Sequence, residues 1–275
     1  MNSYPLSFIH QQYIIIFVNI YMKIDIVLTS SDTSDHYLRL YPHIHKIWKE
    51  KFGLECKLIL IANKIPDFLS KYNSSIILFP PIPGVHTAFI AQVIRILYPC
   101  LCNKVVLVTD VDIFPISKSY FIDSIASISN DKFVSYRSDC LNRKMISICF
   151  NVAHSDIWKG IFEINTIDEI TNTIKTWYNT LSLYNGKKNC EGWFTDQQKL
   201  YEYVMKWNKG IVLLSDNNLK FNRLDKRQRS YIISNINKVK YDIKNGMYTD
   251  FHCIKPYSRY KGLITDLTNV ICSAK

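Results

Sequence analysis

Short apolar runs alternate with amphipathic stretches throughout the first half of this 275-residue chain. The apolar runs predict strands at residues 24–28, 56–62, 76–79 and 104–108. Between them, residues 37–52 and 86–97 carry apolar side chains at helical spacing and predict helices. After Lys104 the run 104–108 is apolar without interruption, so we expect that strand to be buried on both faces of a sheet.

The second half of the chain is less regular. It predicts strands at residues 133–136, 147–152 and 211–214, and helices at residues 167–183 and 195–207. Thr195 is the expected N-cap of the last helix. No internal repeat or linker interrupts the pattern, which therefore predicts a single α/β domain. Its centre should be a mostly parallel twisted sheet flanked by helices.

The first 21 residues stand apart from this alternation. Residues 13–18 are strongly apolar, but Asn19 interrupts the run and polar residues precede it. The run is too short to indicate a membrane span, and it lacks the basic start and small-residue cleavage site of a secretory signal. We therefore interpret residues 1–21 as an N-terminal extension and residues 22–275 as the domain. A signal anchor is the alternative.

The net charge of +11 suits an anionic partner such as nucleic acid, an anionic membrane or a phosphorylated substrate. Much of the excess lies in residues 223–244, for which a solvated basic surface is the simplest interpretation. We expect no nucleic acid partner, because no zinc finger, RNP-type motif or arginine-rich arm is present. The eight cysteines form no CxxC pair. Buried thiols in a reducing, cytoplasmic compartment are the expectation.

Candidate chemistry begins where the strand 104–108 ends, at Asp110 and Asp112. Alternate side chains at a strand end share a face, so the two carboxylates can converge. Carboxylate oxygens suit Mg²⁺ or Mn²⁺, which would neutralise a diphosphate. Two solvated carboxylates at the start of a loop are the alternative. Thr29 and Ser30 follow another predicted strand. They should lie on the same rim of the sheet, where ligands of open α/β sheets bind.

Residues 104–112, Lys-Val-Val-Leu-Val-Thr-Asp-Val-Asp, resemble the KVVYLDxDxxV segment of GT-A glycosyltransferases, particularly those of glycosyltransferase family 8. The resemblance implies a GT-A-type fold in which Asp110 and Asp112 bind a metal that bridges the donor diphosphate. Arg95, followed by Ile96, Leu97 and Pro99, is similar to a helix of that family whose arginine approaches the donor. A salt bridge on the helix surface is the alternative for Arg95.

Two further segments resemble the same family. Asp196 and Gln197 match an Asp-Gln element whose side chains contact the donor sugar, which implies a catalytic role for both; capping of the helix 195–207 is the alternative. His252 matches a histidine that completes the metal site, and Lys255 matches a lysine that meets the diphosphate. Here only two residues separate His252 from Lys255, whereas the family has a longer gap. Arg259 or Lys261 is therefore an alternative source of that charge.

The resemblance implies an enzyme that moves a hexose from a nucleotide diphosphate sugar to an acceptor hydroxyl, with retention of configuration. The expected donor is UDP-glucose or UDP-galactose, and the expected cofactor is Mn²⁺ or Mg²⁺. A homodimer is compatible with the resemblance. The acceptor is not indicated. The alternatives are a nucleotide-sugar-binding protein without turnover and a metal-dependent nucleotidyltransferase. A nucleotidyltransferase would carry a Gly-rich Lys/Arg signature after the first strand, and this sequence has none there.

Overall fold

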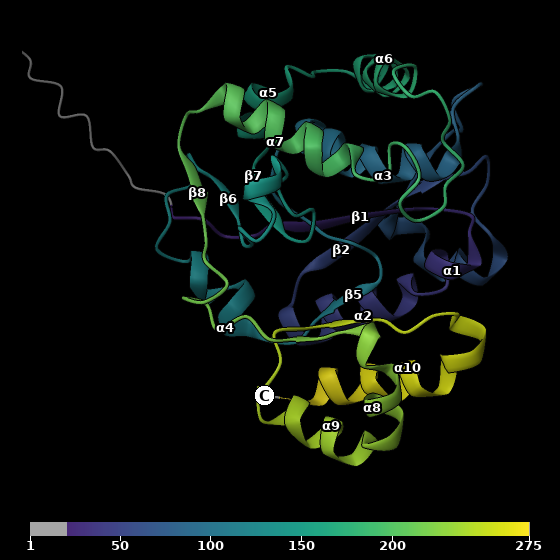
Figure 1. Ribbon diagram of the computed structural model, residues 1–275, viewed down its shortest axis with the longest axis vertical. Helices are drawn as coiled ribbons and strands as arrows, with labels where there is room; N and C mark the ends of the chain where they lie inside the picture. The colour runs from purple at the N-terminus through teal and green to yellow at the C-terminus, as the bar shows by residue number, and fades with distance from the viewer. Residues whose placement is uncertain (1–20, 275) are drawn as a thin grey trace, which may run out of the picture.

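A seven-stranded sheet forms the centre of the computed structural model, which describes residues 21–274 (Figure 1). In spatial order its strands are β3 (Ile76–Phe79), β2 (Glu55–Ile61), β1 (Ile26–Asp32), β4 (Val105–Val108), β7 (Asn151–His154), β6 (Phe133–Ser135) and β8 (Ile211–Leu213). Only β7 runs antiparallel to its neighbours. The predicted α/β fold with a mostly parallel central sheet is therefore confirmed.

A second, three-stranded sheet joins distant parts of the chain. It consists of β5 (Ile113–Pro115), β10 (Asp250–His252) and β9 (Arg223–Leu224). β5 follows β4 after the short loop 109–112, and it pairs antiparallel with β10, so that Ile113 lies opposite His252. This pairing brings the end of β4 to a segment about 140 residues later in the chain.

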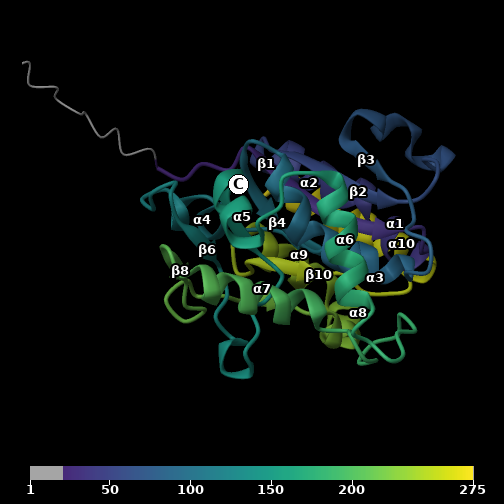
Figure 2. The same cartoon turned by 90° about the horizontal axis from the view of Figure 1, so that it is seen from above.

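Helices cover both faces of the central sheet (Figures 1 and 2). One face carries α3 (Thr87–Leu97), α5 (Ser155–Phe162), α6 (Ile167–Tyr178) and α7 (Thr195–Trp207). The other carries α2 (Tyr41–Phe52), α9 (Ile236–Lys244) and α10 (Tyr257–Ser273). The short helices are α1 (Asp35–Leu38), α4 (Lys118–Phe121) and α8 (Arg229–Ser234). The sequence pattern predicted neither α5 nor the group α8 to α10.

The central strands send alternate side chains to the two layers. In β4, Val105 and Leu107 belong to the core beneath α2 and α10, whereas Val106 and Val108 belong to the core beneath α3. All four are buried, as expected for a strand covered on both faces. The cysteines also follow the prediction, because five of the eight are buried and none forms a disulfide.

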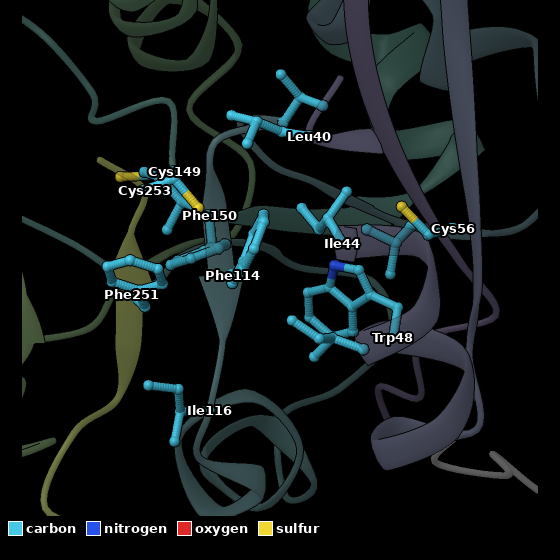
Figure 3. Close-up of a cluster of buried hydrophobic side chains, with 14 of the residues drawn as sticks. Leu40, Ile44, Trp48, Cys56, Phe114, Ile116, Cys149, Phe150, Phe251 and Cys253 are labelled. Carbon is cyan, nitrogen blue, oxygen red and sulfur yellow. The ribbon is translucent and has the colours of Figure 1, made fainter. Parts of the chain in front are cut away.

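The second sheet is anchored by aromatic packing. Phe114 of β5 lies between Phe251 of β10 and the α2 side chains Ile44 and Trp48 (Figure 3). Phe114 and Phe251 meet edge to face, with ring centroids 6.0 Å apart. Because these side chains are fully buried, β5 and β10 have little freedom to shift, and the polar residues beside them are held in place.

Several predicted boundaries are wrong. The strand expected to end at residue 28 continues as β1 through Asp32, because residues 29–32 pair with β2. The helix expected at 37–52 is broken into α1 and α2, since Pro42 fits only the first turn of a helix. The strand expected at 147–152 begins at Asn151, and the helix expected at 167–183 ends at Tyr178.

The start of the described chain packs against the domain. Met22 and Ile24 are buried, and the Met22 amide donates a hydrogen bond to the Ile128 carbonyl, at 2.7 Å. The apolar run 13–18 lies outside the described residues, so the interpretations of the extension stay predictions. Within residues 21–274, no helix is long and apolar enough to cross a membrane.

A half-buried histidine should make stability depend on pH. His43 of α2 contacts Thr268 Oγ1 at 3.0 Å and the Tyr257 hydroxyl at 3.1 Å, both in α10. Burial, followed by the nearby Lys46 and Lys261, lowers the pKa of His43 to about 4. The unfolded chain therefore binds the extra proton first, and stability should fall as the pH drops from 6.5 towards 4. We expect a loss of up to about 2–3 kcal/mol, allowing for the partial exposure of the ring.

Urea denaturation at several pH values measures this loss. In His43→Gln the unfolding free energy should change less between pH 6.5 and 4 than in the wild type, whatever its absolute value. An identical pH slope in the two proteins would show that His43 is not the group responsible.

Candidate functional site

The loop 109–112 is fixed by backbone hydrogen bonds at both ends. The Thr109 amide donates to the Leu28 carbonyl of β1 at 3.0 Å, and the Cys253 amide donates to the Asp112 carbonyl at 2.8 Å. Within the loop, the Ile113 amide donates to the Asp110 carbonyl at 3.3 Å. The loop therefore spans the two sheets and holds both aspartates at the carboxyl end of β4, where ligands of such sheets bind.

Asp112 is surrounded by cationic groups. Its Oδ2 lies 2.7 Å from Lys255 Nζ, 3.2 Å from His252 Nε2 and 3.9 Å from Lys226 Nζ. Burial alone would raise the pKa of Asp112, but Lys255, His252 and Lys226 hold it well below its ordinary value. The carboxylate is therefore ionised at neutral pH. The Lys255 ammonium also lies over the Tyr37 ring, 3.4 Å from its centroid.

A second carboxylate lies behind His252. Asp225 Oδ2 is 3.7 Å from His252 Nδ1, an ion-pair distance rather than a hydrogen bond. Burial lowers the pKa of His252, but Asp112 and Asp225 outweigh it and the net pKa is raised. Asp225 caps the short 3₁₀ helix η5 (Lys226–Gln228) by accepting from the Arg227 amide at 2.8 Å. The same turn thus orients His252 and presents Lys226 to Asp112.

Arg95 connects the Asp110 motif at the end of β4 with the Asp196 motif at the start of α7. From α3 its Nη1 binds Asp110, and its Nη2 donates to Asp196 Oδ2 at 2.8 Å. Arg95 is buried, so the salt bridge on the helix surface considered from the sequence is instead an internal one. Burial opposes the charge on the guanidinium, but Asp110 and Asp196 raise the net pKa of Arg95. Burial also raises the pKa of Asp196, against the opposite effect of Arg95.

Asp196 and Gln197 form the first turn of α7. Asp196 is 2% exposed, and its Oδ1 accepts from the Gln197 amide at 2.9 Å. The Gln197 carbonyl accepts from the Ile146 amide at 3.1 Å. Thr195 is the first helical residue rather than the N-cap, which is Phe194. The predicted cap at Thr195 is therefore wrong.

Thr29 and Ser30 do not reach the rim. Because β1 continues to Asp32, both residues lie within the strand and are buried. The Ser30 hydroxyl donates to the Ala91 carbonyl of α3, and within residues 21–274 the Thr29 hydroxyl has no hydrogen-bond partner. This placement does not favour the nucleotide contacts expected of their hydroxyl groups.

Three contributors were missed from the sequence: Gln92, Asp225 and Lys226. No motif marks them, and Lys226 was counted as part of a solvated basic surface. That interpretation is wrong for part of the run, since Arg223 donates to the fully buried Asp250 at 2.6 and 2.7 Å. The alternatives Arg259 and Lys261 are exposed on α10, so among the predicted cations it is Lys255 that meets Asp112.

The donor atoms suit a divalent cation in part. Among residues 21–274 no group of three or more His, Cys, Asp or Glu side chains could hold a metal ion. Asp110 is drawn to Arg95, so the expected set of Asp110, Asp112 and His252 is not assembled in advance. The pair Asp112 and His252 does fit, because two adjacent ligands of an octahedral metal with bonds of about 2.1 Å lie about 3 Å apart. Mg²⁺ commonly takes only one or two protein carboxylates plus substrate phosphates.

The sequence matches no protein-family model and no curated protein. Among solved structures, it is similar to the glycosyltransferase GlyE of Streptococcus pneumoniae TIGR4, with 13% identity and a TM-score of 0.49 over 91% of this chain. This chain spans only 62% of the GlyE chain.

Two further solved structures are similar over parts of the chain. The bifunctional glycosyltransferase WbbM has 12% identity and a TM-score of 0.37, over 75% of this chain and 40% of its own. A putative glucose-1-phosphate thymidylyltransferase from Bacillus anthracis has 13% identity and a TM-score of 0.32, over 57% and 82%. At this level of likeness, the activity of the chain has to be argued from its own residues.

Proposed function

We propose that this protein is a metal-dependent glycosyltransferase that moves a hexose from a nucleotide diphosphate sugar, UDP-linked, to an acceptor hydroxyl. The observation that carries the proposal is the meeting of Asp112, His252 and Lys255 at the end of β4. An ionised carboxylate, an imidazole and an ammonium group at one point suit a metal-bound diphosphate better than they suit an uncharged ligand.

Each residue of the site has a role in this proposal. Asp112 and His252 would hold Mn²⁺ or Mg²⁺, which when bound neutralises charge on the leaving diphosphate. Lys255 and Lys226 add positive charge on the same side, and Asp225 orients His252. Arg95 binds both Asp110 and Asp196 and holds the two carboxylates in place beside one another.

Asp196 and Gln197 would contact the donor sugar from the start of α7. This assignment rests on the resemblance of residues 192–197 to family 8 and on the link from Asp196 through Arg95 to Asp110. Retention of configuration follows from the same resemblance. It requires no strong general base beside the acceptor, and we assign none.

Binding of UDP should stabilise the protein only when a divalent metal is present. At a ligand concentration of about 100 Kd, binding to the folded state adds about 2.7 kcal/mol. For a domain of this size that raises Tm by about 5–10 °C. Thermal unfolding with UDP and MnCl₂, compared with UDP and EDTA, measures the effect. The absence of any UDP effect in either condition would contradict the proposal.

Product analysis separates the proposed enzyme from the two alternatives. A transferase should release UDP slowly from UDP-glucose or UDP-galactose in the presence of Mn²⁺, even with water as the acceptor. A binding protein would be stabilised by the same compounds without turnover. A nucleotidyltransferase would instead release pyrophosphate from a nucleoside triphosphate and a sugar phosphate.

A further inference from the structure

One glutamine links the two halves of the candidate site. Gln92 lies three residues before Arg95 and so on the same side of α3. Its Nε2 donates to the Trp193 carbonyl at 2.7 Å and the Gly192 carbonyl at 3.1 Å, and lies 3.1 Å from Asp196 Oδ1. Its Oε1 accepts from the Tyr184 hydroxyl at 3.2 Å. Both the amide nitrogen and the amide oxygen of Gln92 are therefore hydrogen-bonded.

These contacts complete the fixation of Asp196. Oδ2 is held by Arg95, and Oδ1 is held by Gln92 and by the Gln197 amide. With both oxygens bound, the carboxylate cannot rotate about its side-chain bonds without breaking hydrogen bonds in a buried environment. Gln92 and Arg95, one turn apart on α3, thus determine together where Asp196 points.

Gln92 also ties down the loop 179–194 that precedes α7. This loop folds back on itself, since the Glu191 carboxylate accepts from the Ser182 and Leu183 amides at 2.8–3.1 Å. Gly192 has a φ of +80°, and a Cβ there would lie 2.5 Å from Leu181 Cδ1, so the turn requires glycine. The carbonyls of Gly192 and Trp193 point away from this turn towards Gln92 of α3.

We propose that Gln92 is a positioning residue. It holds residues 184–193 of the loop 179–194, together with the first turn of α7, against α3 so that Asp196 faces the donor sugar. The positioning of Asp196 follows from the contacts alone, whereas its consequence for sugar transfer rests on the proposed function. An amide is required at this position because it both donates and accepts. A carboxylate would face two carbonyl oxygens and Asp196. An apolar side chain of similar size would remove the donor to the Trp193 carbonyl and one of the donors to Asp196 Oδ1.

Hydrogen–deuterium exchange of the full chain tests the positioning without any activity. In Gln92→Met, amides of residues 184–197 should exchange about tenfold faster than in the wild type, while those of β4 and β5 keep their rates. Tyr184→Phe, which removes only the bond to Oε1, should give a smaller increase. Unchanged exchange at residues 184–197 in a folded Gln92→Met protein would overturn the proposal.

Turnover of UDP-glucose or UDP-galactose tests the consequence. Gln92→Met should lower kcat by about 10–100-fold, as for other residues that orient a site side chain, with the Kd for UDP and Mn²⁺ unchanged. Because Gln92 acts through Asp196, the double variant Gln92→Met/Asp196→Asn should be no slower than Asp196→Asn alone. Effects that multiply would refute action through Asp196. A wild type that turns over no nucleotide sugar would refute the proposed function instead, and the exchange experiment would still decide the role of Gln92.

Discussion

Replacement of Asp112 by asparagine is expected to lower the rate of nucleotide-sugar turnover by about 10²- to 10³-fold, the range for loss of one group that stabilises transition-state charge. Asparagine keeps the size of the side chain but removes the negative charge that gathers Lys255, His252 and Lys226. It should therefore also weaken the stabilisation by UDP and Mn²⁺. Initial rates with UDP-glucose and UDP-galactose, and thermal unfolding with UDP, measure the two effects.

Asp35→Asn is the matched control for this experiment. Asp35 is an exposed carboxylate in α1, and within residues 21–274 its ion-pair partner is Arg39, one turn away. Its replacement should leave turnover and UDP binding close to those of the wild type. If Asp112→Asn retains wild-type turnover while the control behaves as expected, Asp112 is not the centre of the donor site.

Replacement of Arg95 by methionine is expected to reduce the free energy of unfolding by about 3–5 kcal/mol, the usual result of removing one partner from a buried ion pair. Asp196 is almost fully buried and would lose its charged partner, with Gln92 and the Gln197 amide as its remaining contacts. Arg95→Lys should recover only part of the loss, because one ammonium group cannot bridge Asp110 and Asp196 as the planar guanidinium does. Urea denaturation gives the free energies directly.

Two comparisons test whether the unpaired buried charge of Asp196 causes the loss of stability in Arg95→Met. Arg39→Met removes a half-exposed arginine that pairs with one aspartate and lies over the Phe68 ring, and it should cost only about 1 kcal/mol. The double variant Arg95→Met/Asp196→Asn removes both charges and should be more stable than Arg95→Met alone. A double variant that is less stable than the single one would indicate that Arg95 stabilises the fold through packing.

The alternation of apolar runs and amphipathic stretches was sufficient to predict the fold class. Strand β4 sends alternate side chains into the two cores, and a continuous apolar run is the local pattern that satisfies both layers. The end of a strand was less predictable where pairing with a neighbouring strand determines it. Residues 29–32 have turn-forming side chains, but pairing with β2 keeps them extended. The helices α8 and α9 were missed because both are short and α9 has lysines between its apolar positions, which weakens the helical pattern.

Charge alone also misjudged the segment that contains Lys226. A basic run normally faces solvent, and Arg227 and Lys238 do so. Lys226 instead turns towards Asp112, because Asp225 caps the turn that begins with Lys226 and pairs with His252. The contacts that select one lysine from the seven basic residues of the segment 223–244 are made with residues far away in the sequence, so no local signal identifies it.

By itself, the sequence determined which groups are available for chemistry. Asp110 and Asp112 follow a buried strand, and Asp196, His252 and Lys255 stand in motifs that can be identified one by one. Only the tertiary structure decided how they are combined. The pairing of β5 with β10 places His252 beside Asp112, and α3 supplies both Arg95 and Gln92 to Asp196. The reason is physical: secondary structure follows from side chains close in sequence, whereas a polar site is assembled from groups whose charges and hydrogen bonds are satisfied only across the folded core.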